Sequence, residues 1–198
     1  MIQKYFYKYS DNFFNIKSVR VVYVLVLMML CSVSGVNAQE DAYREYIKTY
    51  KGIAVKHQKQ YGIPASITLA QGLLESDAGR SRLARKANNH FGIKCGNDWR
   101  GRKIKHNDDK KRECFRRYKR AKHSYEDHAK FLMKQRYAPL FRLDVTDYKG
   151  WAKTLKRCGY ATDPNYPEKL IKIIEKYELY KYDKPGRKKK QKGKSERR

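Results

Sequence analysis

The sequence is poor in acidic residues, in cysteine and in long apolar runs. Its 47 Lys and Arg outnumber its 20 Asp and Glu, so the 198 residues carry a formal net charge of +27 at pH 7. The four cysteines include no close Cys-x-x-Cys pair, and no paired histidines accompany them, so a zinc site is not expected. The apolar run at 21–30 is shorter than the roughly 20 residues that cross a bilayer. We therefore expect no metal, no cofactor and no stable membrane span in the mature chain.

Residues 1–38 have the pattern of a secretory signal peptide. Basic side chains precede the apolar run, and small residues follow it up to Ala38, where we expect the cut. An uncleaved membrane anchor is the alternative, but the run is short for one. A lipoprotein signal at Cys31 is disfavoured, because Leu30 stands where such signals carry a small residue. The sequence thus predicts export to the periplasm or the extracellular side, in association with the cell envelope.

The charge of the mature chain predicts attraction to polyanions. It keeps a net charge of +24, since the signal peptide accounts for +3. Nucleic acid, anionic lipid and anionic envelope polymers all fit such a charge. Export argues against nucleic acid, so envelope polymers are the expected electrostatic partners. The stretch 184–198 holds nine basic residues and no aromatic or aliphatic side chain, which predicts a disordered tail after one folded domain at 39–183.

The stretch 63–94 organises the rest of the chain. Pro64 suits the first position of a helix, which needs no N–H. Apolar residues recur on one broad face of this helix, and Gly79 provides a stop, because glycine adopts the left-handed conformation that ends helices. The narrow strip opposite the apolar face holds Thr68, Gln71, Gly72 and Glu75.

Glu75 is the last polar group of this helix. A carboxylate there meets the negative end of the helix dipole, and apolar surroundings disfavour its charged form. Both effects raise its pKa. An acid that keeps its proton near neutral pH is what the cleavage of a glycosidic bond needs to protonate the leaving oxygen. The alternative is a solvated glutamate at the end of an ordinary core helix.

Three runs carry a resemblance to a known family. They are LAQGLLESDAGRSRLARKANNHFGIKC, CFRRYKRAKHSYEDHAKFL and CGYATDPNYPEKLIKII, in that order. Together they resemble the peptidoglycan-hydrolysing N-acetylglucosaminidases of glycoside hydrolase family 73, over residues 43–182. The resemblance implies a lysozyme-like α+β fold that is mainly helical with a small β-hairpin lobe, and it places the catalytic glutamate on Glu75.

The stretch 99–118 alternates around a polar turn, which predicts a β-hairpin. In the resembled family the second carboxylate lies on this hairpin. Asp108 or Asp109 is the favoured candidate, with Glu113 close behind. The alternative is that these acids only neutralise neighbouring lysines on a solvated turn.

The resemblance also implies which residues line the sugar cleft. In the NNxFG-type loop, Asn88 and Asn89 would bond acetamido groups and Phe91 would pack against a ring. Helix capping and turn formation are the alternative roles of the two asparagines. Gln71 and Tyr118 are further expected contacts of the substrate.

The loop 160–166 faces the cleft in family members, and its tyrosine stands near the catalytic glutamate. That catalytic role falls on Tyr160, and Tyr166 is expected to contact the substrate. Core packing at the entry of the last helix is the alternative for both. His90 is expected to be a polar surface residue and not a catalytic one.

The mature chain holds three cysteines, an odd number that leaves one unpaired. Cys95 and Cys114 flank a polar excursion, so a disulfide between them would staple its base and contribute roughly 3 kcal/mol in the chain-entropy model. Cys158 is expected to be a buried small hydrophobe at a helix end.

The remaining segments predict further helices. One covers 40–61, and a capping box at 124–127 is expected to open another. Thr146 is expected to cap the next helix, which buries Trp151. The last helix is expected to start at Pro167.

These observations predict a secreted hydrolase that cuts the β-1,4 bond after N-acetylglucosamine in peptidoglycan strands. Glu75 would protonate the leaving oxygen. Either a carboxylate of the hairpin would activate water, or the acetamido group of the substrate would attack with the help of Tyr160. A lytic transglycosylase of the same fold and a non-catalytic basic module that binds the envelope are the alternatives.

Overall fold

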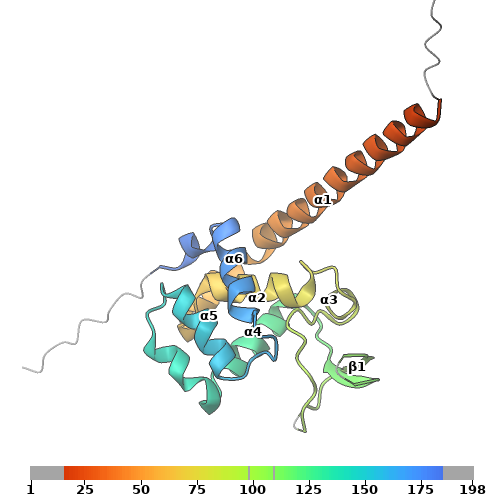
Figure 1. Ribbon diagram of the computed structural model, residues 1–198. Helices are drawn as coiled ribbons and strands as arrows, with labels where there is room; N and C mark the ends of the chain where they lie inside the picture. The colour runs from red at the N-terminus through yellow and green to blue at the C-terminus, as the bar shows by residue number, and fades with distance from the viewer. Residues whose placement is uncertain (1–15, 98, 109, 185–198) are drawn as a thin grey trace, which may run out of the picture. The chain divides into compact units, whose positions relative to one another are not determined.

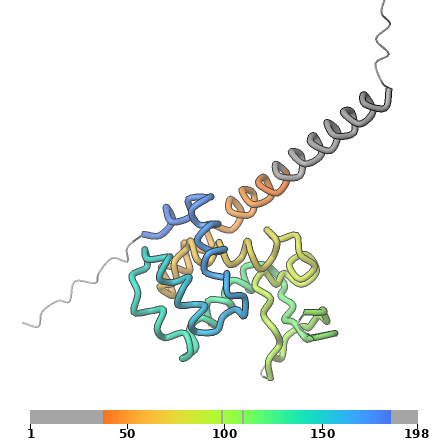
Figure 2. The backbone as a smooth tube through the Cα atoms, in the orientation of Figure 1, coloured from red at the N-terminus to blue at the C-terminus, as the bar shows by residue number. Residues whose placement is uncertain are grey.

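The computed structural model describes residues 16–97, 99–108 and 110–184, and for 16–37 it describes the backbone alone (Figures 1 and 2). The chain divides into two units, Met1–Asp41 and Ala42–Arg198. The first helix, α1 (Ile16–Tyr61), begins in the first unit and ends in the second. The helix expected at 40–61 is therefore present, and it extends further towards the N-terminus than the sequence indicated. Within the described residues, no helix is both long enough and apolar enough to cross a membrane.

The second unit is mainly helical and contains one small antiparallel sheet of two strands, as expected for the lysozyme-like α+β fold (Figure 1). The elements that follow α1 are α2 (Ala65–Ser76), α3 (Arg82–Ala87), β1 (Lys103–His106), β2 (Glu113–Arg116), α4 (Ala121–Leu132), the 3-10 helix η1 (Gln135–Arg142), α5 (Tyr148–Arg157), α6 (Tyr166–Lys176) and the 3-10 helix η2 (Leu179–Tyr182).

Helix α2 lies at the centre of this unit and contacts α5, α6 and η2. Every residue from Ala65 to Leu73 is buried, including Thr68, Gln71 and Gly72 of the polar strip opposite the apolar face. The sequence predicted one broad apolar face on a mostly buried helix, and the structure buries the helix as far as Leu73 and leaves Leu74 and Glu75 half-buried. Small residues permit this close packing, since the Cβ of any larger residue at Gly72 would come within 2.6 Å of the Tyr46 hydroxyl.

The end of α2 differs from the prediction. The helix stops at Ser76, and the left-handed residue that ends it is Asp77 at φ 51°, not Gly79. Ala78 also has a positive φ and donates its N–H to the carbonyl of Leu73 at 2.9 Å, so the chain leaves the helix before the glycine is reached. Glu75 consequently sits in the last turn of α2, as expected.

The start of α2 is held by the C-terminal segment. The Asp183 carboxylate accepts the backbone N–H of Ser66 at 2.9 Å and its hydroxyl at 2.5 Å, although the two residues are 117 positions apart. Gln58 accepts the N–H of Ala65 at 2.9 Å and donates to the carbonyl of Lys184 at 2.7 Å. These bonds satisfy N–H groups of the first turn, which have no partner inside the helix.

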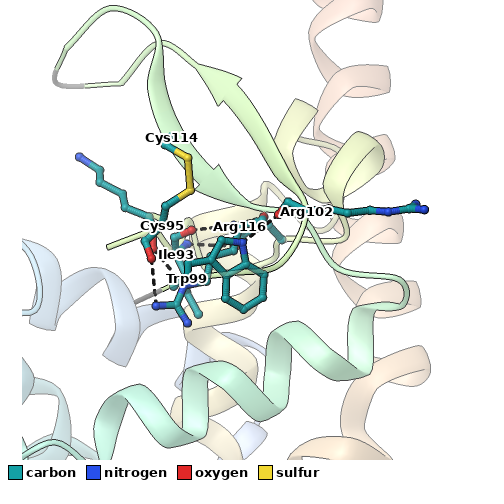
Figure 3. Close-up of a disulfide and its surroundings, with 8 residues drawn as sticks. Ile93, Cys95, Trp99, Arg102, Cys114 and Arg116 are labelled. Atoms are coloured by element: carbon teal, nitrogen blue, oxygen red, sulfur yellow. Dashed lines mark hydrogen bonds between the residues drawn. A yellow bond between two sulfur atoms is a disulfide. The ribbon is translucent and has the colours of Figure 1, made fainter. Parts of the chain in front are cut away.

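The hairpin forms as predicted, with Ile104 opposite Phe115 and Lys105 opposite Cys114. The segment before it joins the sheet, because Cys95 donates its N–H to the carbonyl of Cys114 at 2.9 Å. The same two residues form a disulfide with a Cα–Cα distance of 5.5 Å (Figure 3). The hairpin and this segment, residues 93–118, are called the β-lobe below.

Three predicted helix starts are wrong by one to four residues. Helix α4 begins at Ala121, and Ser124 lies buried inside it, where its hydroxyl accepts the N–H of His90 at 3.0 Å instead of capping its own helix. Asp147 and not Thr146 caps α5, by accepting the N–H of Gly150. Helix α6 begins one residue before its proline.

Two predicted segments lie partly outside the described residues. The expected signal peptide covers residues 1–38, of which 1–15 are not described. The expected basic tail at 184–198 is described only at Lys184, and the buried Asp183 precedes it. Cys158 follows α5, is half-buried and not fully buried as expected, and is a free cysteine.

Candidate active site

Glu75 shares a hydrogen-bond chain with two buried residues. The Tyr166 hydroxyl donates to Glu75 Oε1 at 3.0 Å, and Gln71 Nε2 donates to the Tyr166 hydroxyl oxygen at 3.0 Å. Gln71 lies one helical turn before Glu75 on α2, and Tyr166 is the first residue of α6. The packing of α6 against α2 therefore brings the phenol to the carboxyl group.

The pKa of Glu75 is raised above its ordinary value. Burial is the main cause, since it disfavours the charged carboxylate, and the hydrogen bond from Tyr166 opposes it. The negative charge of Asp108 raises the pKa further. A half-buried carboxyl group of this kind retains its proton to a higher pH than a solvated glutamate, as a general acid requires.

Two tyrosines lie beside the acid. The rings of Tyr160 and Tyr166 stack with centroids 5.6 Å apart and an interplanar angle of 30°. The sequence assigned the catalytic assistance to Tyr160, whereas the hydrogen bond to Glu75 comes from Tyr166. Burial raises the pKa of both phenols well above 10, so both are neutral hydrogen-bond donors at physiological pH.

The described acids of the hairpin share one lysine. Lys94 Nζ lies 3.2 Å from Asp108 Oδ2 and 3.0 Å from Glu113 Oε1. Glu113 also accepts the backbone N–H of Lys110 at 3.1 Å. Asp108 is half-exposed, and its charge acts on the pKa of Glu75. Asp109 lies outside the described residues, and among the described hairpin acids Asp108 raises the pKa of Glu75.

The two asparagines of the predicted cleft loop attach the β-lobe to α3. Asn88 is the left-handed residue at the end of α3 and donates its side-chain amide to the carbonyl of Tyr118 at 3.1 Å. Asn89 is buried, and its side-chain amide donates to the carbonyls of Ile93 at 3.0 Å and Arg116 at 2.9 Å. Their contact with substrate stays a prediction, as does that of Gln71, which is fully buried.

Two aromatic residues that the sequence assigned to the cleft are also buried. Phe91 is 5% exposed and stacks on His128 with ring centroids 3.9 Å apart. Tyr118 is 7% exposed and donates its hydroxyl to Asp127 Oδ2 at 2.5 Å. In the described part of the chain, no group of three or more His, Cys, Asp or Glu side chains is placed to hold a metal ion.

Comparison with known proteins identifies the family. The sequence model of the glucosaminidase family, described as mannosyl-glycoprotein endo-beta-N-acetylglucosaminidase, matches residues 51–179. The chain belongs to this family. It is 39% identical to the exo-glucosaminidase LytG of Bacillus subtilis over 157 residues, which cover 72% of this chain and 54% of LytG. It is 29% identical to the peptidoglycan hydrolase FlgJ of Vibrio parahaemolyticus over 161 residues, which cover 75% of this chain and 52% of FlgJ. The chain therefore spans about half the length of these two relatives.

Solved structures of the glucosaminidase family share the fold. A peptidoglycan hydrolase from Sphingomonas sp. A1 superposes with a TM-score of 0.61 at 30% identity, over 70% of this chain and 91% of that one. The glycoside hydrolase domain of Salmonella typhimurium FlgJ superposes with a TM-score of 0.60 at 28% identity, over 70% of this chain and 90% of that one. The expected fold is confirmed.

In this member of the family, His90 does not lie on the surface as predicted. It is 3% exposed, and its Nδ1 lies 3.0 Å from the hydroxyl of Tyr46, which accepts from Tyr125 at 2.7 Å. Burial lowers the pKa of His90 to about 4, so the ring is neutral. The sequence signal for this cluster was Gly72, since a glycine inside a helix marks the close approach of another group.

Arg116 was not singled out from the sequence, although it holds the base of the β-lobe (Figure 3). Its guanidinium lies 3.0 Å from Asp127 Oδ2 on α4 and donates to the carbonyls of Lys94 at 3.1 Å and Cys95 at 3.2 Å. The guanidinium carbon also lies 4.7 Å from the ring centroid of Trp99. The lobe that carries Asp108 is thereby tied to the helices.

Proposed function

We propose that the chain is a hydrolase that cleaves the β-1,4 bond after N-acetylglucosamine in peptidoglycan glycan strands, with Glu75 as its general acid. The observation that carries the proposal is the half-buried Glu75. Its pKa is raised, and its carboxyl group accepts a hydrogen bond from the hydroxyl of Tyr166. Membership of the glucosaminidase family supports the reaction class. The names of LytG, an exo-glucosaminidase, and of FlgJ, a peptidoglycan hydrolase, support the substrate.

In this mechanism the Glu75 proton passes to the glycosidic oxygen as the bond to the anomeric carbon breaks. The resulting carboxylate is stabilised by the hydroxyl of Tyr166. On the first route, water adds to the anomeric carbon and Asp108 accepts its proton. On the second route, the acetamido oxygen of the substrate bonds to the anomeric carbon as the leaving group departs; water then displaces that oxygen, and the Glu75 carboxylate accepts the proton of the water. A carboxyl separation of roughly 6.5–9.5 Å favours the first route, because it leaves room for the water.

The location and the partners of the enzyme form part of the same proposal. Residues 1–38 would direct export, and residues 39–183 would act on the wall outside the cytoplasm. The basic side chains of the mature chain, including those of the stretch 184–198, would hold the enzyme near anionic envelope polymers, since the mature chain carries a net charge of +24. Binding to such polymers should weaken steeply as salt rises, because it releases counterions.

The test is the digestion of purified peptidoglycan by the full chain, followed by mass spectrometry of the fragments. Glu75→Gln keeps the shape of the side chain and removes its acid, so we expect a rate lower by about 10²–10⁴-fold. Glu45→Gln is the control, because Glu45 is a solvated glutamate of α1 with 69% of its side chain exposed. Fragments with N-acetylglucosamine at the reducing end, formed by the wild type and the control alone, support the proposal.

Other products would contradict it in distinct ways. Anhydro-muramic ends would indicate a lytic transglycosylase. Full activity of Glu75→Gln would remove Glu75 from the chemistry. An absence of cleavage combined with salt-sensitive binding to the wall would indicate a non-catalytic binding module.

A further inference from the structure

The hydroxyl of Tyr166 has two polar neighbours at the same distance. Gln71 Nε2 lies 3.0 Å from it on one side, and Glu75 Oε1 lies 3.0 Å from it on the other. Tyr166 is 3% exposed and Gln71 is fully buried. Bulk water therefore cannot replace the bond between Gln71 and Tyr166.

The chemistry of the three groups determines which atom donates and which accepts in each of these hydrogen bonds. The amide nitrogen of Gln71 carries hydrogens and no acceptor site, so it donates to the phenol oxygen. The phenol has a single hydrogen, which is then free to point at the carboxyl group of Glu75. We propose that Gln71 is a positioning residue that directs the hydroxyl hydrogen of Tyr166 onto Glu75. The consequence for catalysis rests on the function proposed above for Glu75.

The hydrogen bonding of the Gln71 amide supports a role in orienting Tyr166. Among the described residues, its Oε1 is buried and has no hydrogen-bond partner. A buried acceptor without a partner is unfavourable, so packing alone would be served better by an apolar side chain of similar volume. The bond from Nε2 to Tyr166 is the contact that an apolar residue could not make. The reversed amide would offer Oε1 to the phenol and draw its hydrogen away from Glu75.

The hydrogen bond from Tyr166 to Glu75 becomes important when Glu75 loses its proton. A hydrogen bond to a carboxylate is stronger than one to the neutral acid, so the chain Gln71–Tyr166–Glu75 stabilises the state formed during proton transfer. Asp108 on the hairpin opposes it, because its negative charge disfavours the carboxylate. Tyr160, which lies before α6, is neutral at physiological pH. The effect of Gln71 should therefore fall on kcat and not on KM.

The first experiment needs no activity. The full chain is labelled at glutamate carboxyl carbons and the signal of Glu75, identified by its loss in Glu75→Gln, is titrated by NMR. We expect the pKa of Glu75 to rise in Tyr166→Phe and, by less, in Gln71→Met, with no further rise in the double variant. Thr68→Val changes an equally buried polar side chain on α2 and should leave the titration unchanged.

The second experiment follows the wild type and Tyr166→Phe and leaves Gln71 unchanged. The side-chain amide signal of Gln71 should shift as Glu75 titrates, and this response should vanish in Tyr166→Phe, because the phenol connects the two groups. The measurement remains decisive if Gln71→Met does not fold. A pKa of Glu75 that is unchanged in a folded Gln71→Met, or an amide signal that ignores the titration, would overturn the proposal.

Turnover of peptidoglycan provides the third readout. Gln71→Met should lower kcat roughly 10-fold with KM unchanged, and should cost nothing more in the Tyr166→Phe background. Additive losses would show that Gln71 acts independently of Tyr166, which contradicts the proposal. A wild type that does not cleave peptidoglycan would refute the proposed function, while the two NMR experiments would still decide the role of Gln71.

Discussion

Three effects set the pKa of Glu75, and they act in different directions. Burial and the charge of Asp108 favour its neutral form, and the hydroxyl of Tyr166 favours its carboxylate. The sequence alone supported the first of these effects, because apolar residues surround Glu75 on its helix. The other two depend on contacts between α2, the hairpin and α6, which no local pattern determines.

Asp108→Asn should shift the pH dependence of the enzyme. A general acid loses activity as the pH rises through its pKa, and the negative charge of Asp108 raises the pKa of Glu75. The alkaline limb of the kcat/KM profile should therefore move to lower pH in Asp108→Asn. Glu178→Gln removes an exposed acid that pairs with Lys181, so it controls for net charge. If both variants kept the limb of the wild type, the electrostatic influence of Asp108 would be excluded.

At the scale of elements, two further contacts at the base of the β-lobe add to the hydrogen bonds that Asn88 and Asn89 make to it. Arg116 binds Asp127 of α4 and the carbonyls of residues 94 and 95, and the disulfide joins Cys95 to Cys114 (Figure 3). Neither contact involves the polar turn of the hairpin itself. The lobe that presents Asp108 is thus fixed where it leaves the helices.

Cys114→Ser should destabilise the chain by about 3 kcal/mol, because the disulfide restricts a loop of intermediate length in the unfolded state. Urea denaturation with and without reductant measures the difference. Cys158→Ser is the matched control, since Cys158 is unpaired in the described chain and its replacement should leave the reductant effect intact. A wild type that is equally stable with and without reductant would contradict a stabilising role of the disulfide.

The sequence predicted the elements better than their ends. The hairpin followed from alternation and a polar turn, and α2 followed from its apolar face and Pro64. Ser124 looked like a helix cap, but its hydroxyl binds the distant N–H of His90. Asp77 ends α2 ahead of Gly79, because the turn there is fixed by hydrogen bonds to Leu73. The partner of Ser124 is 34 residues away and is invisible in a single sequence, whereas the end of α2 was a local choice between neighbouring residues.

At the scale of the whole molecule, buried histidines make stability depend on pH. Burial lowers the pKa of His90 to about 4 and that of His128 to about 3. Among the described residues, neither ring nitrogen of His128 has a hydrogen-bond partner. The unfolded chain protonates both residues near pH 6.5, so it binds more protons than the folded chain below that pH.

We therefore expect stability to fall as the pH drops from about 6.5 towards 4, by about 2 kcal/mol per histidine at pH 5. Asp183 acts in the opposite sense, because burial raises its pKa to about 6 and its stabilising contribution is lost as the pH rises through that value. Glu75, whose pKa burial also raises, acts in the same sense as Asp183, and His57, whose pKa burial lowers, adds to the effect of the two histidines. We expect the histidines to outweigh the two acids. Thermal unfolding at pH 5 and pH 7 measures the net effect, and His128→Leu should flatten the difference. Greater stability at pH 5 than at pH 7 would refute the argument.

Asp183 also has a consequence for the order of events during synthesis. Its carboxylate binds the first turn of the helix that carries Glu75, across 117 positions of sequence. A growing chain lacks this partner until nearly all of the folded unit has been made. The helix that carries Glu75 can therefore reach its final hydrogen bonding only after elongation has passed residue 183, so the candidate site is completed late in the synthesis of the folded unit.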